Sequence, residues 1–325
     1  MNKIVSRREF LETAFATAVV GAAGGVPSAL RAEDAATPQG IRVRFLGSGA
    51  ASWRPEWAKK NPYMRRQSSV LLENRVLIDF TACSFDHLPA DCRPEALFQT
   101  HSHGDHYDPA SAVKVGVKRL CVHETWAAAA RREVAEAAKA LGLPAPEVVA
   151  LSFGVPVEAG GLRVTAVPAN HSTSRLTDGV LERTSLYLVE KGSSRLLYAT
   201  DTGGIPGDAA RMIGIDAHIA EPSYSKRYGQ NPMVHAPQPI TALIMEATNG
   251  DGDDDFRLFV HSSVQTVDRT VRMLKRTGRF VPPDGQSAYL THLGIKYRGW
   301  PAEKIDAELP SGLRAASDGL EVVLG

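Results

Sequence analysis

The chain has 325 residues, of which 43% are hydrophobic and 22% are charged, so it can bury a full core without disulfides. Its formal net charge of +1 becomes −1 when residues 1–32 are set aside, because that segment holds four Lys or Arg and two Glu. Nothing in this balance marks the remaining chain for nucleic acid or for an anionic membrane.

Residues 1–32 have the pattern of an export signal. A twin-arginine motif at Ser6–Leu11 contains Arg7 and Arg8, and the apolar stretch 14–23 follows it. That stretch is shorter than the roughly 20 apolar residues needed to cross a membrane. We expect a twin-arginine signal peptide over 1–32, passage through the twin-arginine export machinery, and a periplasmic or extracellular protein with no membrane anchor. The alternative is a frayed N-terminus with two incidental arginines.

After a linker over 33–40, the rest of the chain predicts one domain over 41–325. Alternating or continuous apolar runs predict strands, and amphipathic stretches predict helices. The segment 222–239 is long and polar, which is typical of a functional or disordered loop. Two series of strands, each with helices, predict an α/β fold of two sheets packed between helical layers. The expected strands are 41–46, 68–72, 76–80, 96–100, 162–167, 184–189, 195–199, 217–220, 242–245 and 288–291, and the expected helices are 127–141, 208–213 and 264–276.

The three cysteines show no CxxC spacing. An odd number cannot be fully paired within one chain, so we expect Cys83, Cys92 and Cys121 to be buried or free thiols. A bridge between Cys83 and Cys92 is the alternative.

The most informative segment is His-Ser-His-Gly-Asp-His at 101–106. So many polar side chains would each need a buried partner in a core, and a metal ion supplies one for all of them. His101 and His103 share a face of an extended segment, and Asp105 and His106 turn toward a neighbouring position. Imidazole and carboxylate ligands suit Zn²⁺, with Mn²⁺ and Fe as alternatives.

Together with later residues, this motif is similar to the metallo-β-lactamase superfamily. The later residues are His171 in Pro168–Ser172, Asp201 in Tyr198–Gly203 and His292 in Tyr289–Gly294. The resemblance runs over essentially all of 41–325 and implies a four-layer αββα sandwich of two mixed sheets flanked by helices. It also implies two divalent metal ions. Carried over residue by residue, one ion has His101, His103 and His171, the other has Asp105, His106 and His292, and Asp201 bridges them.

Two departures within the superfamily narrow the expected chemistry. The bridging position is Asp201 where zinc β-lactamases commonly place a Cys, and His103 stands where flavodiiron oxidoreductases place a Glu. The segments Leu46–Ala50, Arg65–Ser69 and His261–Ser263 look most like the phosphodiesterases that open cyclic phosphates during phosphonate breakdown. Pyrroloquinoline-quinone biosynthesis proteins and transfer-RNA 3′-processing nucleases share parts of this pattern. The long arm that the nucleases use is absent from the sequence, so we do not expect a nucleic-acid substrate.

The resemblance predicts a metal-dependent hydrolase that attacks a small phosphodiester with a metal-bridging hydroxide. Asp105 is a ligand that can also accept a proton, and His261 is the candidate general acid for the leaving alkoxide. The alternative for His261 is a cap of the helix at 264–276, which Ser262 or Ser263 would do better.

Arg65 and Arg66, with Arg54, Lys59 and Lys60 nearby, are candidate substrate-phosphate ligands, since guanidinium groups bind phosphate bidentately. A solvated charged face is the alternative.

These residues are compatible with three functions. The first is a periplasmic phosphodiesterase, and the second is a hydrolase of thioesters, lactones or lactams. The third is a non-catalytic binding or assembly protein on the same fold. A homodimer is compatible with all three. The loop Ser223–Tyr228, leading to His235, is a further candidate to cover the site, or else an ordinary surface excursion.

Overall fold

The computed structural model describes residues 40–51, 53–216, 238–252 and 256–325. The signal segment, the expected strand at 217–220 and the loop Ser223–Tyr228 with His235 lie outside these ranges. Among the described residues, no helix is both long and apolar enough to cross a membrane. All three cysteines are buried and free, so Cys83 and Cys92 are not bridged.

The first sheet contains seven strands in the order β16-β1-β2-β3-β4-β5-β6. Pairing is antiparallel from β16 to β3 and parallel from β3 to β6. In β1, Ile41, Val43 and Phe45 are buried whereas Arg42 is exposed, which is the alternation that the sequence predicts. The strands are β1 (Ile41–Gly47), β2 (Ser69–Leu72), β3 (Val76–Ile78), β4 (Ala96–Phe98), β5 (Arg119–His123), β6 (Glu147–Leu151) and β16 (Glu321–Leu324).

The second sheet also contains seven strands, in the order β15-β14-β13-β12-β11-β8-β7. It is antiparallel from β7 to β12 and parallel from β12 to β15. A separate two-stranded hairpin, β9 (Leu176–Thr177) with β10 (Val180–Leu181), projects from the loop after β8. The strands of the sheet are β7 (Pro156–Ala159), β8 (Leu162–Pro168), β11 (Ser185–Lys191), β12 (Ser194–Ala199), β13 (Ala242–Glu246), β14 (Ala288–Thr291) and β15 (Leu313–Ala315).

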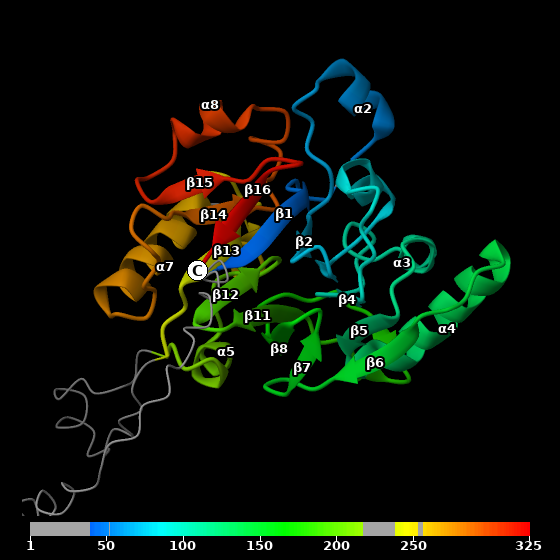
Figure 1. The fold of residues 1–325 in the computed structure, drawn as a ribbon. Helices are drawn as coiled ribbons and strands as arrows, with labels where there is room; N and C mark the ends of the chain where they lie inside the picture. Colours follow the sequence, from blue (N-terminus) through cyan, green and yellow to red (C-terminus); the bar gives the residue numbers. More distant parts are fainter. Residues whose placement is uncertain (1–39, 52, 217–237, 253–255) are drawn as a thin grey trace, which may run out of the picture. The chain divides into compact units, whose positions relative to one another are not determined.

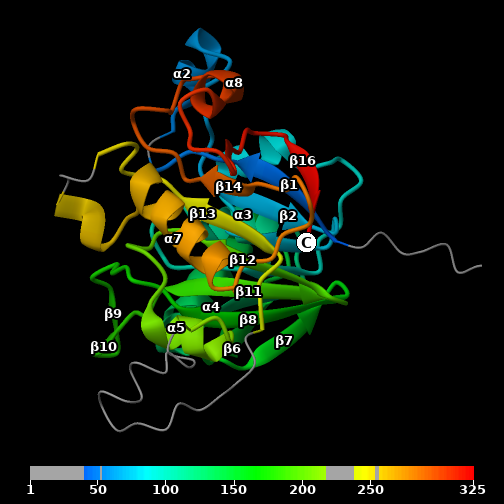
Figure 2. The same cartoon turned by 90° about the vertical axis from the view of Figure 1, so that its left-hand side faces the viewer.

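Helices cover the outer faces of both sheets, which gives the expected four layers (Figure 1). One apolar core joins the two sheets, a second joins the first sheet to α3 and α4, and a third joins the second sheet to α5, α7 and α8. Viewed from the α7 side, α7 lies in front of the sheets and α3 and α4 lie behind them (Figure 2). The helices are α2 (Pro55–Lys60), α3 (Pro109–Lys114), α4 (Glu124–Leu141), α5 (Gly207–Met212), α7 (Val264–Arg276) and α8 (Ala302–Asp306), with 3-10 turns η1 (Ala82–His87) and η2 (Phe256–Phe259).

The first residues of two helices show what the sequence pattern predicts correctly and what it misses. Helix α7 has the expected bounds, and Ser263 caps it by accepting a hydrogen bond from the Thr266 N–H at 3.1 Å. The capping alternative for His261 is therefore wrong. Helix α4 begins three residues before the expected Ala127, because the buried ring of His123 accepts a hydrogen bond from the Thr125 N–H at 3.3 Å.

Candidate metal centre

The expected metal ligands gather where strands of both sheets end. His101 follows β4, His171 follows β8, Asp201 follows β12, and His292 follows β14 directly. Asp201 and His292 have left-handed backbones, with φ of 50° and 48°. Such conformations cost a non-glycine residue about 1 kcal/mol or more, and they are concentrated at functional sites. The fold thus turns the chain sharply at these two positions and aims both side chains into one region.

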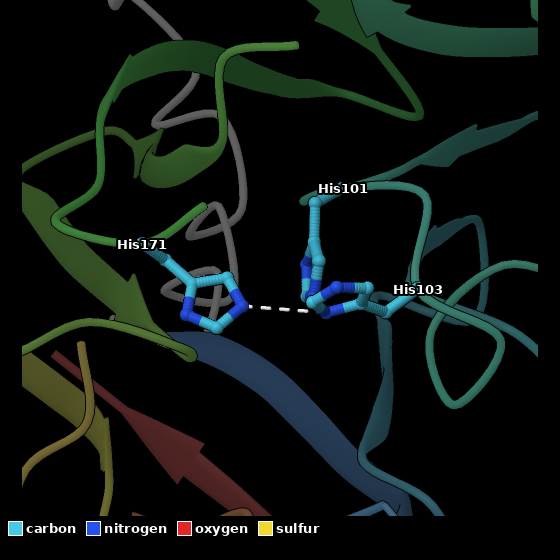
Figure 3. Close-up of side chains that lie close together, drawn as sticks. All are labelled: His101, His103 and His171. Carbon is cyan, nitrogen blue, oxygen red and sulfur yellow. Dashed lines mark hydrogen bonds between the residues drawn. The ribbon is translucent and has the colours of Figure 1, made fainter. Parts of the chain in front are cut away.

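Three histidines form the first ligand group. His101 Nε2 lies 2.9 Å from His103 Nδ1, and His171 Nε2 lies 3.3 Å from the same atom. Figure 3 shows the three rings pointing toward one another, with His171 from one loop and His101 and His103 from another. Three ring nitrogens converging at such distances could hold one metal ion, since three protein ligands are typical of a catalytic zinc site.

Asp105, His106 and His292 form the second group. The two Nε2 atoms of His106 and His292 are 3.2 Å apart. Asp105 Oδ2 lies 3.4 Å from the former and 3.3 Å from the latter. Gly294 supports this arrangement, because a Cβ there would lie 1.8 Å from the Thr248 carbonyl oxygen, against which the turn after His292 packs.

Asp201 lies between the two groups. Its Oδ2 is 3.0 Å from His106 Nε2 and 3.4 Å from His292 Nε2, while its Oδ1 is 4.0 Å from His171 Nε2. Asp201 is buried, and its Oδ2 accepts no hydrogen bond. A buried carboxylate oxygen without a donor is costly unless a cation binds it. The residues therefore fit a divalent metal ion, and Asp201 has carboxylate oxygens near both groups.

Hydrogen bonds to the outer ring nitrogens orient four of these histidines. A partner that accepts a proton from Nδ1 fixes the tautomer whose Nε2 lone pair faces the centre. His103 is the exception, since its Nδ1 faces the centre. The pairs are His106 with Asp79 at 2.7 Å, His292 with the Thr248 hydroxyl at 2.7 Å, His101 with the Thr100 hydroxyl at 2.9 Å and His171 with the Val260 carbonyl at 3.2 Å.

Two buried carboxylates that the sequence analysis did not select, Asp79 and Glu246, also belong to the groups that orient the ligand rings. The Thr100 hydroxyl donates to Asp79, and the Thr248 hydroxyl donates to Glu246. Asp79 thus holds one ligand directly and His101 through a threonine. Both carboxylates follow runs of buried apolar residues at the ends of β3 and β13, and this is the signal that could have found them.

The charge state of the cluster suits cation binding. Burial lowers the pKa of His101, His103 and His171, which keeps these imidazoles neutral. Burial also lowers the pKa of His106, but the charges of Asp201 and Asp105 outweigh it and raise that pKa well above its ordinary value. The carboxylates that would hold a proton on His106 are the same groups that would hold a cation.

His261 lies beside the cluster and is held by Glu246. Its Nδ1 is 3.0 Å from Glu246 Oε1 and 3.6 Å from Asp201 Oδ1, and its ring centroid is 5.0 Å from that of His171. Burial lowers the pKa of His261, but the hydrogen bond and charge of Glu246 outweigh it and raise that pKa. His261 therefore lies next to the candidate metal ligands with its Nδ1 bonded to Glu246.

Arg65, a candidate phosphate ligand, is bonded to protein groups. Its side chain is buried, and its guanidinium donates to the Ser48 hydroxyl at 2.7 Å, to the Ala316 carbonyl and to the Trp300 carbonyl at 3.3 Å. These bonds connect β1 to the loops before α8 and after β15. Arg65 is thus a structural residue, because its donors are already used inside the protein.

The guanidinium of Arg66 is likewise paired with protein groups. Its guanidinium pairs with Asp86 at 2.8 Å and with Asp318 at 3.5 Å, so two carboxylates occupy the group expected to bind phosphate. Nearby, Arg54 stacks over Trp57, while Lys59 and Lys60 are exposed on α2. Both arginines therefore bind protein groups, and anion binding at this edge stays a prediction.

Comparison with known proteins identifies the family. Several solved structures share the fold: a diphosphatase of the PhnP family (TM-score 0.54, 18% identity, covering 88% of this chain and 100% of that one), Zn²⁺-bound PqqB from Methylobacterium extorquens (0.54, 16%, 86% and 99%) and the short form of human tRNase Z (0.56, 16%, 87% and 99%). No curated protein matches in sequence. A family model described as the beta-lactamase superfamily domain matches residues 74–292, more than half of the chain. The chain therefore belongs to the β-lactamase superfamily, the family of metal-dependent hydrolases that its histidine motif predicts.

Proposed function

We propose that the protein is an exported hydrolase that binds two divalent metal ions and cleaves a small phosphodiester. The observation that carries this proposal is Asp201, a buried carboxylate between two separate ligand groups, with His261 beside it. The donor atoms are nitrogen and oxygen throughout, which suits Zn²⁺, with Mn²⁺ and Fe as alternatives.

Seven side chains would hold the ions. When bound, the pair would supply Lewis acidity toward the phosphoryl oxygens and lower the pKa of a water molecule. Asp79 and the two threonines hold the ligand rings in the tautomers that this requires. Burial raises the pKa of Asp105, but His106 and His292 outweigh burial and hold that pKa well below its usual range, which favours a ligand role over a base role. The ligands are His101, His103, His171, Asp105, His106, His292 and the shared Asp201.

His261 would protonate the leaving alkoxide. Its Nδ1 is occupied by Glu246, so we assign proton transfer to Nε2. Glu246 also accepts hydrogen bonds from the N–H groups of Thr202, at 2.7 Å, and Thr248, at 3.1 Å, which fixes the carboxylate in place. A positioned acid of this kind typically contributes 10²- to 10⁴-fold in rate.

Two features favour phosphodiesters over the alternative substrates. An alkoxide is a poor leaving group that needs a proton, and His261 is placed to give one, whereas the thiolate of a thioester leaves without a proton. Asp201 also stands where the resemblance places a cysteine in zinc β-lactamases. Thioesters, lactones and lactams remain the alternative substrates, and a binding or assembly role is the non-enzymatic alternative.

A substrate panel separates these functions. The mature protein, reconstituted with Zn²⁺ or Mn²⁺, is assayed with bis-p-nitrophenyl phosphate, acyl thioesters and nitrocefin. We expect hydrolysis of the phosphodiester, lost in His103→Ala and retained in His87→Ala, a half-buried histidine outside the cluster. A metal-loaded wild type inactive on every ester would contradict the enzyme proposal.

Export is tested separately. Arg7 and Arg8 carry the proposal, since they form the twin-arginine motif. Replacement of both by Lys should retain the full-length protein in the cytoplasm, as measured by fractionation of the expressing cells. Unchanged delivery to the periplasm would contradict twin-arginine export and leave the proposed chemistry intact.

A further inference from the structure

Four large exposed apolar side chains lie on two segments that are bonded to the loops of the candidate metal ligands. In the β9–β10 hairpin, Leu176 is 66% exposed, and Val180 and Leu181 are each about half exposed. Phe259, at the end of η2, is 79% exposed. We call these four side chains the apolar rim. Exposed apolar side chains beside a reactive centre can contact the apolar part of a ligand.

The hairpin half of the rim is attached to the metal ligands. It begins five residues after His171, and its far end carries the buried Glu182. Glu182 accepts a hydrogen bond at 2.7 Å from the N–H of Ser102, the residue between His101 and His103. The hairpin is therefore fixed at both ends to the loops that supply the first ligand group.

A further contact holds the hairpin on the outer helix. Arg175, directly before β9, pairs with Glu133 of α4, and its guanidinium carbon lies 5.8 Å from the ring centroid of Trp126. The base of the hairpin is thus held by charge and stacking, while its apolar side chains face solvent. Exposure of these side chains follows from how the hairpin is anchored.

Phe259 belongs to a different segment, which is bonded to the same ligand, His171. It immediately precedes Val260, whose carbonyl accepts the hydrogen bond from His171 Nδ1, and His261 follows. The hairpin and η2 lie at the same edge of the domain (Figure 2). The bond between His171 and Val260 joins the two segments at the cluster, so the apolar rim borders the metal ligands from two directions.

We propose that the apolar rim binds an apolar alkyl or aryl group on the retained side of the substrate, so that the enzyme selects phosphodiesters with one hydrophobic ester group. This inference rests on the proposed function and names its substrate class. Binding sites of enzymes commonly combine an apolar lining with a few polar groups at the reacting atoms. Arg65 and Arg66, the arginines expected to bind a charged group, are occupied by protein partners.

The test compares two substrates that differ only in the retained group, methyl p-nitrophenyl phosphate and hexyl p-nitrophenyl phosphate. The leaving group is the same, so the ratio of kcat/KM reports binding of the alkyl chain. Each buried methylene is worth about fourfold, so burial of two or three of the five additional methylenes predicts a ratio of about thirtyfold for hexyl over methyl.

The double variant Leu176→Ser/Phe259→Ser should reduce this ratio to about fivefold or less and leave the methyl ester unaffected, since methyl does not reach the rim. Val281→Ser is the matched control, because Val281 is 52% exposed and lies outside the rim. It should keep the wild-type ratio. Sedimentation velocity of the wild type and the double variant is measured on the same preparations.

The outcomes separate this inference from the proposed function. A wild-type ratio near one, or a ratio that the double variant does not change, would overturn the apolar subsite while hydrolysis itself upheld the phosphodiesterase. Absence of hydrolysis of either ester would overturn both. A wild-type dimer that the double variant dissociates would show that a second copy of the chain covers the rim, and would also overturn the inference.

Discussion

Asp79→Asn tests how the hydrogen bonds to the outer nitrogens of the ligand rings control metal binding. In the wild type, Asp79 Oδ2 accepts the proton of His106 Nδ1 at 2.7 Å, and Oδ1 accepts the Thr100 N–H at 2.8 Å. Asparagine keeps the shape and one acceptor, but it places an amide nitrogen opposite Nδ1. The amide can donate only to an unprotonated Nδ1, which moves the ring proton to Nε2 and removes the metal-binding lone pair.

The expected loss is 10- to 100-fold in affinity for one ion, or about 1.4 to 2.7 kcal/mol. The apoprotein is titrated with Zn²⁺ in competition with a chelating dye, and circular dichroism checks that each variant is folded. Asp108→Asn is the matched control, since the Asp108 side chain bonds the first turn of α3 and asparagine caps helices equally well. Both binding constants within twofold of wild type in Asp79→Asn would refute the reasoning.

Thr248→Val provides the same test at His292 without a change of charge. The Thr248 hydroxyl accepts from His292 Nδ1 at 2.7 Å, and valine removes that acceptor at nearly equal volume. A weaker second ion is again expected. Unchanged affinity in this variant and in Asp79→Asn would mean that the hydrogen bonds at Nδ1 do not control the ligands.

Three further predictions follow from other groups. Arg65→Met should lower the free energy of unfolding in urea by about 3 kcal/mol, because buried acceptors lose their donor. The kcat/KM per folded molecule should be unchanged. A stable variant with a raised KM would instead indicate that Arg65 binds the substrate. His261→Gln should reduce kcat about 10²-fold or more for alkyl leaving groups but less than about tenfold for p-nitrophenolate, which leaves without a proton; equal losses would argue against an acid role. Burial lowers the pKa of His123 to about 4 in the folded protein, whereas its ordinary pKa in the unfolded chain is about 6.5. Between these two values the unfolded chain binds a proton that the folded protein does not. The free energy of unfolding should therefore fall by about 3 kcal/mol as the pH is lowered from 6.5 to 4. For His123→Gln, the free energy of unfolding in urea should change by about 3 kcal/mol less over this pH range than for the wild type. An identical pH profile for the two proteins would contradict this prediction.

The sequence predicts much of the ligand set because those residues have a local signature. His101 to His106 are contiguous, and His171, Asp201 and His292 each follow an apolar strand. Asp79 and Glu246 were missed because a single carboxylate after a strand has no spacing partner in the sequence. Their role appears only when the fold brings Thr100, Thr248 and the ligand rings beside them.

The partners of Arg65 and Arg66 are not evident in the sequence. Adjacent arginines look like a charged surface there, but Arg65 is buried, and two acceptors of the pair, the Ala316 carbonyl and Asp318, come from more than 200 residues further along the chain. Short strands were missed for a similar reason. β15 and β16 have three and four residues each, too few for a periodic pattern, and they are held by pairing with β14 and β1.

Metal titration of activity tests the central claim most directly. Purified mature apoprotein receives increasing equivalents of Zn²⁺ or Mn²⁺, and hydrolysis of bis-p-nitrophenyl phosphate is followed at each step alongside bound metal measured by mass spectrometry. Because Asp201 lies between two ligand groups, activity should rise until two ions per chain are bound and then level off. Full activity at one ion per chain, or an inert protein with two ions bound, would contradict the account.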